Sequence, residues 1–327
     1  MTVQEVQEMV KSIKAKKDKI GGIKQIYFVA CGGSLGAFYP AKYFLESESK
    51  TFRVGYYTSN EFVHATPKLL GENSMVVLCS HAGNTPETVA AAKLCQSRGA
   101  TTITFTYTEG SAITKYGDYT VIYEWGPDAI CENQKPSIGL RIAFEVLHQV
   151  EGYENYEKAV DGFDKIHDIV INAKEHVGQR AKVFAQEYKD EKIIYTMSSG
   201  ASYGSAYMES ICILLEMQWI NSSSFHSGEY FHGPFEITDT ETPFILLVNE
   251  GRTRALDERA LTFLNKYGKK IVVLDAKELG LSRIDDTVIE FFNPFLFTNV
   301  LDVYNQALAE ARKHPLTIRR YMFKMEY

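Results

Sequence analysis

The stretch QIYFVACGGSLGAFYPA, residues 25–41, decides the fold. An apolar run with strand propensity ends in two glycines and a serine, and a helical pattern follows directly. Further apolar β-rich runs lie at 52–58, 75–80, 101–107 and 119–124, with helical stretches between several of them. Strands that alternate with helices indicate a parallel sheet, because each helix carries the chain back to begin the next strand. The sequence therefore predicts an α/β fold with a doubly wound, flavodoxin-like sheet flanked by helices.

The same unit recurs in the second half of the chain. The stretch KIIYTMSSGASYGSAYME, residues 192–209, again joins a strand pattern to glycines and a helix, and further strand patterns lie at 244–248 and 270–276. A weaker echo links 79–92 with 247–261, each a strand followed by Gly, Thr and a helix. Duplication of one fold explains both echoes. The matched positions are Gly32, Ser34, Gly36 and Tyr39 with Gly200, Ser202, Gly204 and Tyr207.

The length of 327 residues and a hydrophobic content of 45% allow more than one core. We expect a first domain over 1–150, a charged helical connector over 151–190, and a second domain over 191–327.

Charge and composition exclude several classes of protein. The net charge is −6 and no long run of Lys and Arg is present, so a nucleic-acid partner is not expected. The first twenty residues lack the apolar region of a signal peptide, and no apolar run has transmembrane length. Five scattered cysteines include no C-x-x-C pair. A cytoplasmic protein with reduced, structural thiols is the expectation.

Two glycine- and hydroxyl-rich loops follow predicted strands of the first half. They offer Gly33 and Ser34 in one loop, and Ser80, His81 and Thr85 in the other. Free N–H groups and hydroxyls at the start of a helix suit a phosphate. For either loop alone, simple N-capping by Ser34 or Thr85 is an equally good interpretation. Neither loop has Rossmann or Walker spacing, so no nucleotide cofactor is predicted.

A possible acid–base pair lies in the second half. Glu216 sits in SICILLEMQWI, a helical stretch that is apolar on nearly every face, so burial should raise its pKa toward the range useful for proton transfer. A buried structural Glu is the alternative. His232 follows in HSGEYFHGPFE and titrates near neutrality. A metal site of His226, Glu229 and His232 matches no zinc spacing, so no metal is predicted.

The C-terminal tail, HPLTIRRYMFKMEY, gathers the cations Arg319, Arg320 and Lys324. A solvated basic tail is one interpretation. A lid that brings a cation to a sugar phosphate is the other.

The motifs CGGS, SHAGNTPET and GEYFHGPFE together resemble the duplicated SIS-domain (sugar isomerase) family. This family includes the isomerase half of glucosamine-6-phosphate synthase and the fructosamine or fructoselysine 6-phosphate deglycases. The resemblance to the deglycases spans nearly the whole chain and includes LLEMQW and the C-terminal tail.

The resemblance implies roles for particular residues. The sugar phosphate would bind to Gly33, Ser34, Ser80, His81 and Thr85, although His81 and Ala82 replace part of the usual S-x-S-G pattern. Glu216 lies sixteen residues before His232, the spacing of the family's catalytic Glu and His. Lys324 corresponds only loosely to a lysine in the tail of the synthase.

The resemblance also implies a function. We expect a deglycase that converts a 6-phosphorylated Amadori-type sugar amine and water to glucose 6-phosphate and free amine, with no metal or cofactor. A homodimer is expected, with His232 contributed to the site of the neighbouring subunit. The polar, glycine-containing segment 221–233 is expected to project from the sheet and to carry His232 there. Aldose–ketose isomerisation or amination of a phosphosugar is an alternative, although no Cys nucleophile follows Met1. A phosphosugar sensor without catalysis is a further alternative.

Overall fold

The computed structural model describes residues 1–322 and 324–326. The chain forms two compact units, Met1–Phe163 and Asp164–Tyr327. The segment expected as a helical connector contains helix α7 (Tyr156–Tyr188), within which the boundary between the units falls.

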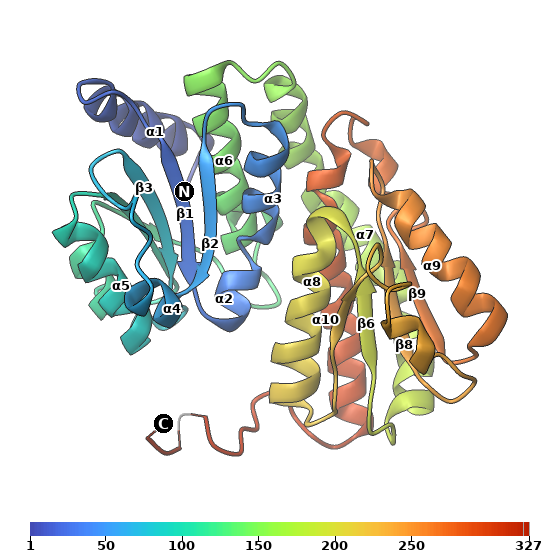
Figure 1. Ribbon diagram of the computed structural model, residues 1–327. Coiled ribbons are helices and arrows are strands. Elements are labelled where there is room, and N and C mark those ends of the chain that lie inside the picture. Colours follow the sequence, from blue (N-terminus) through green and yellow to red (C-terminus); the bar gives the residue numbers. More distant parts are fainter. Residues whose placement is uncertain (323, 327) are drawn as a thin grey trace. The chain divides into compact units, whose positions relative to one another are not determined.

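The first unit is built on a five-stranded sheet in the order β2-β1-β3-β4-β5, with every neighbouring pair parallel (Figure 1). The strands are β1 (Gln25–Ala30), β2 (Arg53–Thr58), β3 (Ser74–Cys79), β4 (Thr101–Thr106) and β5 (Tyr119–Ile122). Strands β1, β3 and β4 are buried along their whole length because helices cover both faces of the sheet.

Helices form a layer on each face of this sheet (Figure 1). Helices α1 (Val3–Asp18), α3 (Tyr39–Glu48) and α6 (Lys135–Glu151) lie on one face, and α4 (Ser59–His64) and α5 (Pro86–Ser97) lie on the other. Successive side chains of a strand point to opposite faces. Tyr27 and Val29 of β1 therefore pack in the α4/α5 layer, whereas Phe28 stacks with Phe38 toward the other layer.

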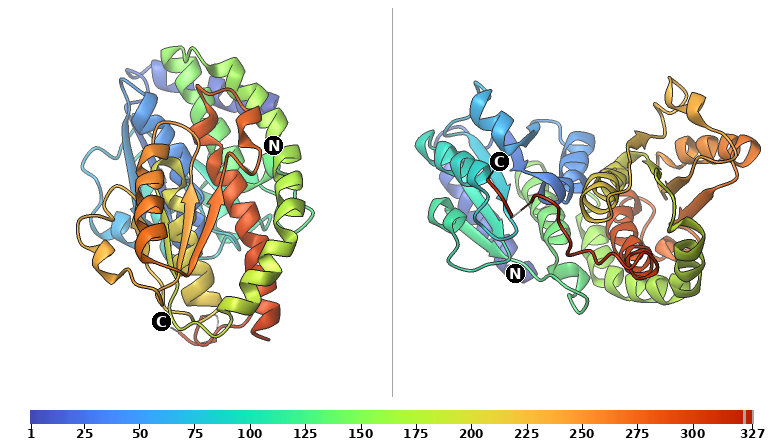
Figure 2. Two further views of the ribbon diagram at one scale, coloured as in Figure 1. Left: turned by 90° about the vertical axis from the view of Figure 1, so that its right-hand side faces the viewer. Right: turned by 90° about the horizontal axis from the view of Figure 1, so that it is seen from below.

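The second unit has a four-stranded parallel sheet in the order β7-β6-β8-β9. Figure 2 shows helices α9 (Arg254–Tyr267) and α10 (Asn293–Ala311) on opposite faces of this sheet. Helix α8 (Tyr203–Met208) continues into a π-helix, Glu209–Met217, on the α10 side. The strands are β6 (Tyr195–Ser198), β7 (Ser224–His226), β8 (Phe244–Val248) and β9 (Ile271–Asp275).

Backbone geometry supports the duplication. Gly32 after β1 and Gly200 after β6 both have a φ of 52°, a left-handed conformation that favours glycine. The second echo is present as well, since Gly83 and Thr85 lead from β3 to α5 and Gly251 and Thr253 lead from β8 to α9. The predicted α/β fold with two parallel sheets is confirmed.

Three local expectations need correction. The helix expected after residue 34 is two helices, α2 (Gly32–Gly36) and α3, with Pro40 in the first turn of α3. The stretch around Glu216 is a π-helix, and Leu215 on it is 40% exposed. The segment 221–233, expected to project from the sheet, contributes β7 to the sheet and buries Tyr230 in the core under α9.

None of the helices in the described ranges combines the length and the hydropathy that a membrane span requires.

Candidate functional site

The loops after β1 and β3 meet at one edge of the first sheet. Parallel strands bring their carboxyl ends to the same edge, and β1 and β3 are neighbours. The chain winds from β1 outward to β2 on one side, and from β3 through β4 to β5 on the other. Such a switch in winding direction is where doubly wound sheets bind ligands, because the two loops diverge there. The loops that carry Ser34 and Ser80 both start at this point.

The loop after β1 presents Ser34 without using it as a helix cap. Cys31 occupies the N-cap position of α2, and Gly33 and Ser34 are half-buried within the helix. The N-capping interpretation of Ser34 is therefore wrong. The Ser34 hydroxyl instead accepts a hydrogen bond of 3.4 Å from Nζ of Lys135.

The loop after β3 holds two hydroxyls together. Ser80 and Thr85 share a hydrogen bond of 2.8 Å, and the Thr85 N–H donates to Oγ of Ser80 at 3.2 Å. Thr85 stands at the N-cap of α5, but its side chain does not cap the helix, and Pro86 begins the helix as predicted. The turn requires glycine at Gly83, where φ is 72° and a Cβ would lie 1.8 Å from Oγ of Ser111. The Thr85 hydroxyl therefore bonds to Ser80 and does not cap the helix that it precedes.

His81 is half-buried in the same loop. Its Nδ1 lies 2.8 Å from the Tyr123 hydroxyl, and its ring stacks on Tyr107. Burial, together with the positive charge of Lys135, lowers the pKa of His81. His81 is therefore a neutral hydrogen-bonding group at neutral pH, not a cation for a phosphate.

Lys135 supplies the positive charge at this edge, and sequence reasoning missed it. Its Nζ reaches Ser34 and lies 5.5 Å from the ring centroid of Tyr123. The structure records no ion pair of Lys135 with a carboxylate in residues 1–322 and 324–326. One feature could have drawn attention to Lys135. It is the first residue of α6, where the helix dipole disfavours a cation. A cation in that place suits an anionic ligand.

The equivalent edge of the second sheet is filled by its own side chains. The buried amide of Asn249 donates to Oγ of Ser198 at 3.2 Å and to Oδ2 of Asp257 at 2.8 Å. The Ser227 hydroxyl donates to the other oxygen of Asp257 at 2.6 Å. In the first unit Ser80 and Thr85 bond to one another at this edge, whereas in the second unit an amide and a carboxylate take part in the network.

Glu216 lies in the π-helix of the second unit and is 24% exposed. Nε of Arg319 lies 2.8 Å from Oε1 of Glu216. Burial raises the pKa of Glu216, while the charge of Arg319 lowers it, and burial has the larger effect. The desolvation predicted for Glu216 is confirmed. A half-buried carboxylate beside a fixed cation can accept and return a proton.

The tail positions Arg319 through its own contacts. Nη1 of Arg319 donates to the carbonyls of Leu316 and Ile318. Arg320 lies over the Trp219 ring at 4.4 Å, just beyond the π-helix. Gln218 donates to the His314 carbonyl at 2.8 Å, which fixes the start of the tail. The tail is therefore packed against the end of the π-helix at Arg319, whereas Arg320 and Lys324 are exposed. The interpretation as a freely solvated basic tail is wrong for Arg319.

His232 is exposed, in a turn that ends at Gly233. The structure records no hydrogen bond or ion pair between His232 and Glu216 among the residues it describes. Lys324 is also exposed, and its backbone N–H donates to the Tyr321 carbonyl. The tail cation at Glu216 is therefore Arg319. The roles of Gly33, Ser34, Ser80, His81, Thr85, Glu216, His232 and Lys324 remain predictions.

The metal alternative finds no support in the structure. In the part of the chain that the structure describes, no three His, Cys, Asp or Glu side chains converge as metal ligands. His226 lies in β7, and its Nδ1 accepts a hydrogen bond from the Gly228 N–H.

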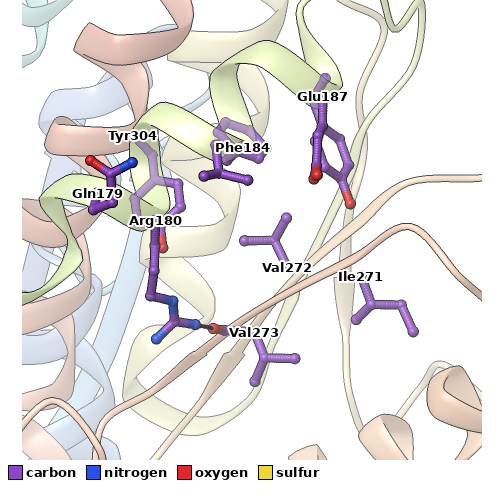
Figure 3. Close-up of a pocket in the computed structure, with 10 residues that line it drawn as sticks. Gln179, Arg180, Phe184, Glu187, Ile271, Val272, Val273 and Tyr304 are labelled. Atoms are coloured by element: carbon purple, nitrogen blue, oxygen red, sulfur yellow. Dashed lines mark hydrogen bonds between the residues drawn. The ribbon is translucent and has the colours of Figure 1, made fainter.

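A pocket of about 310 Å³ in the second unit lies elsewhere (Figure 3). It is lined by α7, by Tyr304 of α10 and by Ile271–Val273 at the amino end of β9. Nη2 of Arg180 donates to the Val273 carbonyl at its wall. The amino ends of parallel strands lie opposite the edge where such sheets bind ligands. The lining includes none of the residues predicted from the sequence, so this pocket does not mark the candidate site.

Comparison with known proteins agrees with the fold and the loops described above. Residues 19–140 match the SIS domain. Over 324 residues the chain is 46% identical to fructosamine deglycase FrlB of Bacillus subtilis (strain 168), covering 99% of this chain and 97% of that protein. It is 28% identical over 278 residues to fructoselysine 6-phosphate deglycase of Escherichia coli (strain K12), covering 84% of this chain and 77% of that protein.

Two solved structures are also similar. The crystal structure of a proposed phosphosugar isomerase from Salmonella typhimurium LT2 is 50% identical, with a TM-score of 0.97 over 99% of this chain and 97% of the other. The C-terminal domain of glucosamine-fructose-6-phosphate aminotransferase from Francisella tularensis has a TM-score of 0.77 at 19% identity, covering 96% of this chain and 95% of that one, which shows a shared fold. Its fold and its relatives together place this chain in the SIS-domain family, as a relative of the fructosamine deglycases.

Proposed function

We propose that this protein is a deglycase of 6-phosphorylated sugar amines. The substrate would be an Amadori-type fructosyl amine 6-phosphate, and the products would be glucose 6-phosphate and the free amine. The observation that carries the proposal is the half-buried Glu216 carboxyl with its raised pKa beside Arg319. The 46% identity to a fructosamine deglycase over nearly the whole chain supports the same substrate class.

The reaction balances with water as the only co-substrate. A base removes a proton from C1 of the open-chain ketosamine, and the proton returns at C2. The amine N–H proton passes to the C2 oxygen, which gives a C2 hydroxyl and an imine between C1 and the amine nitrogen. Water adds to C1, and the adduct collapses with cleavage of the C1–N bond. The water oxygen becomes the aldehyde oxygen of glucose 6-phosphate, and the amine leaves with the remaining proton.

Phosphate binding, proton transfer and ring opening each require a residue with suitable chemistry. The Ser80 and Thr85 hydroxyls would hold the phosphate, together with Ser34 and the charge of Lys135. Glu216 would carry the proton between C1 and C2, and Arg319 favours the ionised form in which Glu216 can act as the base. His232 would assist opening of the sugar ring as a proton donor.

The substitution Glu216→Gln tests this proposal. It keeps the shape and polarity of the side chain but cannot accept a proton, so turnover should fall about 100-fold or more, while the phosphosugar still binds. Amine and glucose 6-phosphate would be measured together from a panel of 6-phosphofructosyl amines. Glu278→Gln, which alters an exposed carboxyl of the same unit, is the matched control. Near-normal turnover by the Glu216 variant would contradict the assignment.

A further inference from the structure

Four aromatic side chains meet at the edge of the first sheet that carries the hydroxyl loops. We call His81, Tyr107, Tyr123 and Trp125 the aromatic cluster. His81 follows β3, Tyr107 follows β4, and the other two follow β5. The His81 ring stacks on Tyr107 with centroids 5.3 Å apart and planes 11° apart, and its centroid lies 4.9 Å from that of Trp125. The three loops are therefore joined through their rings.

The outer two rings of the aromatic cluster contribute little to the core. Trp125 is 65% exposed and Tyr107 is 48% exposed, whereas Tyr123 is only 3% exposed. A single exposed aromatic is ordinary in a globular protein, but adjoining exposed rings on separate loops form an apolar surface that water solvates poorly. Rings placed in this way offer a contact surface to a ligand bound at the candidate site.

The loop that carries Trp125 is held in shape. Glu124 accepts a hydrogen bond from the Ile130 N–H at 2.9 Å through one carboxylate oxygen, and one from the Asn133 amide at 2.9 Å through the other. The Tyr107 N–H donates to the His81 carbonyl, which ties the β4 loop to the β3 loop. A surface fixed in this way can bind a ligand without first having to be ordered.

The aromatic cluster adjoins the residues proposed to hold the phosphate. His81 immediately follows Ser80, and the Tyr123 hydroxyl lies 2.8 Å from its ring nitrogen. Lys135 lies against the ring of Tyr123 and reaches Ser34. A substrate anchored by its phosphate at Ser80 would have this surface beside it.

The loops that carry the two exposed rings are acidic, and this composition favours a cation as the ligand. The loops 107–111 and 123–134 contain Glu109, Glu124, Asp128 and Glu132 but no Lys or Arg. Lys135 directly follows the second of these loops, and its Nζ lies near the buried ring of Tyr123. Aromatic faces attract positive charge through their quadrupole, most strongly in tryptophan, and nearby carboxylates add to this attraction.

We propose that the aromatic cluster is the subsite for the amine part of the substrate, and that Trp125 and Tyr107 select amines that carry a further positive charge. This proposal rests on the proposed deglycase function. Trp125 is a specificity-determining residue: it contacts the leaving amine and takes no part in the proton transfer.

A matched pair of substrates tests the proposal. The 6-phosphofructosyl adducts of 1,5-diaminopentane and of pentylamine share the sugar and the chain length, and they differ in one distal ammonium. The wild-type kcat/KM should favour the diamine adduct by roughly 2- to 30-fold, the scale of a cation–π contact. Trp125→Leu keeps apolar bulk without the aromatic face and should bring the ratio to about 1, whereas Trp125→Phe should keep part of the preference.

Controls separate the possible failures. Tyr267→Leu removes an exposed aromatic from the second unit and should leave the ratio unchanged. In the Glu216→Gln background, calorimetric Kd values for the two adducts should show the same preference without turnover. Equal Kd values, an unchanged ratio in Trp125→Leu, or an equal loss for both adducts would overturn the subsite. Release of neither amine by the wild type, with the Kd preference present, would overturn the deglycase function alone.

Discussion

The pKa of Glu216 results from two opposed effects. Burial in the π-helix penalises the charged carboxylate, whereas Arg319 stabilises it from 2.8 Å away. Arg319 is held by two backbone carbonyls of its own tail, so its charge is fixed before any ligand arrives. A base of raised pKa returns its proton more readily than an ordinary carboxylate does, which suits a reaction that removes a proton and restores it.

Removal of the Arg319 charge should shift the pH profile. Arg319→Gln leaves burial as the main influence, so the pKa of Glu216 should rise further. The base is active when deprotonated, and the acidic limb of kcat/KM should therefore move to higher pH, with activity recovering as the pH increases. Arg319→Lys keeps the charge and should keep the limb closer to that of the wild type. An acidic limb that stays in place in Arg319→Gln would exclude Glu216 as the titrating base.

The Thr85 hydroxyl should affect substrate affinity more than turnover. Thr85→Val keeps the shape but removes the hydroxyl that pairs with Ser80. A hydrogen bond to a charged phosphate exists in ground and transition states alike, so KM should rise about 10-fold or more with kcat nearly unchanged. Thr262→Val, which alters a hydroxyl on α9, serves as the control. An unchanged KM in Thr85→Val would place the phosphate elsewhere.

Secondary structure was predictable where local pattern determines it. The run at 25–30 is apolar, rich in β-formers and bounded by glycine, and β1 spans Gln25–Ala30. Strand β7 was missed because it has only three residues, Ser224–His226, of which Phe225 alone is apolar, and it forms an edge strand through backbone pairing with β6. The π-helix was missed because its hydrophobic pattern resembles that of an α-helix.

The candidate site was likewise predictable only where its residues are close together in the sequence. Ser80 and Thr85 lie in one turn of chain, so motif reasoning could bring them together. Lys135 reaches Ser34, and Arg319 reaches Glu216, from about a hundred residues along the chain, through tertiary packing that no local pattern encodes. The apolar pattern around Glu216 did not indicate that Arg319 would be its partner.

The π-helix contains a second buried carboxyl, which should control stability. Glu209 is 4% exposed, and one of its oxygens accepts a hydrogen bond of 2.9 Å from Asn305. Its other oxygen is buried with no hydrogen-bond partner among the described residues. Burial raises the pKa of Glu209 to about 8, from an ordinary value of 4.5. The folded protein therefore keeps this carboxyl protonated at pH values where the unfolded chain has released the proton.

This difference predicts a pH-dependent effect of Glu209→Gln. Between about pH 5 and pH 8 the folded state binds the extra proton, so the Glu209 contribution to stability falls as the pH rises, by about 1.4 kcal/mol per pH unit at most. The neutral amide does not titrate. The unfolding midpoint of Glu209→Gln, relative to wild type, should therefore increase from pH 5 to pH 8, as followed by circular dichroism. A difference that does not vary with pH would show that Glu209 does not titrate in this range.

At the scale of the whole molecule, the two copies of the fold differ in their polar residues. The sheet edge of the first unit carries the hydroxyls of Ser80 and Thr85, and that of the second carries Asn249 and Asp257. The second unit instead carries Glu216 on a π-helix and His232 on an exposed turn, with no bond between them among the described residues. An exposed His232 can serve a second copy of the chain, as the family resemblance implies.

Mixing two inactive variants tests whether His232 serves the Glu216 of a partner subunit. Glu216→Gln and His232→Ala chains would be unfolded, combined in equal amounts and refolded so that they pair at random. If the site is shared in a symmetric dimer, each mixed dimer has one intact site and one that is doubly damaged. About half of the dimers are mixed and each has one active site of two, so activity should return to about a quarter of the wild-type value. If His232 served the Glu216 of its own chain, every site would lack one group, and mixing would restore nothing.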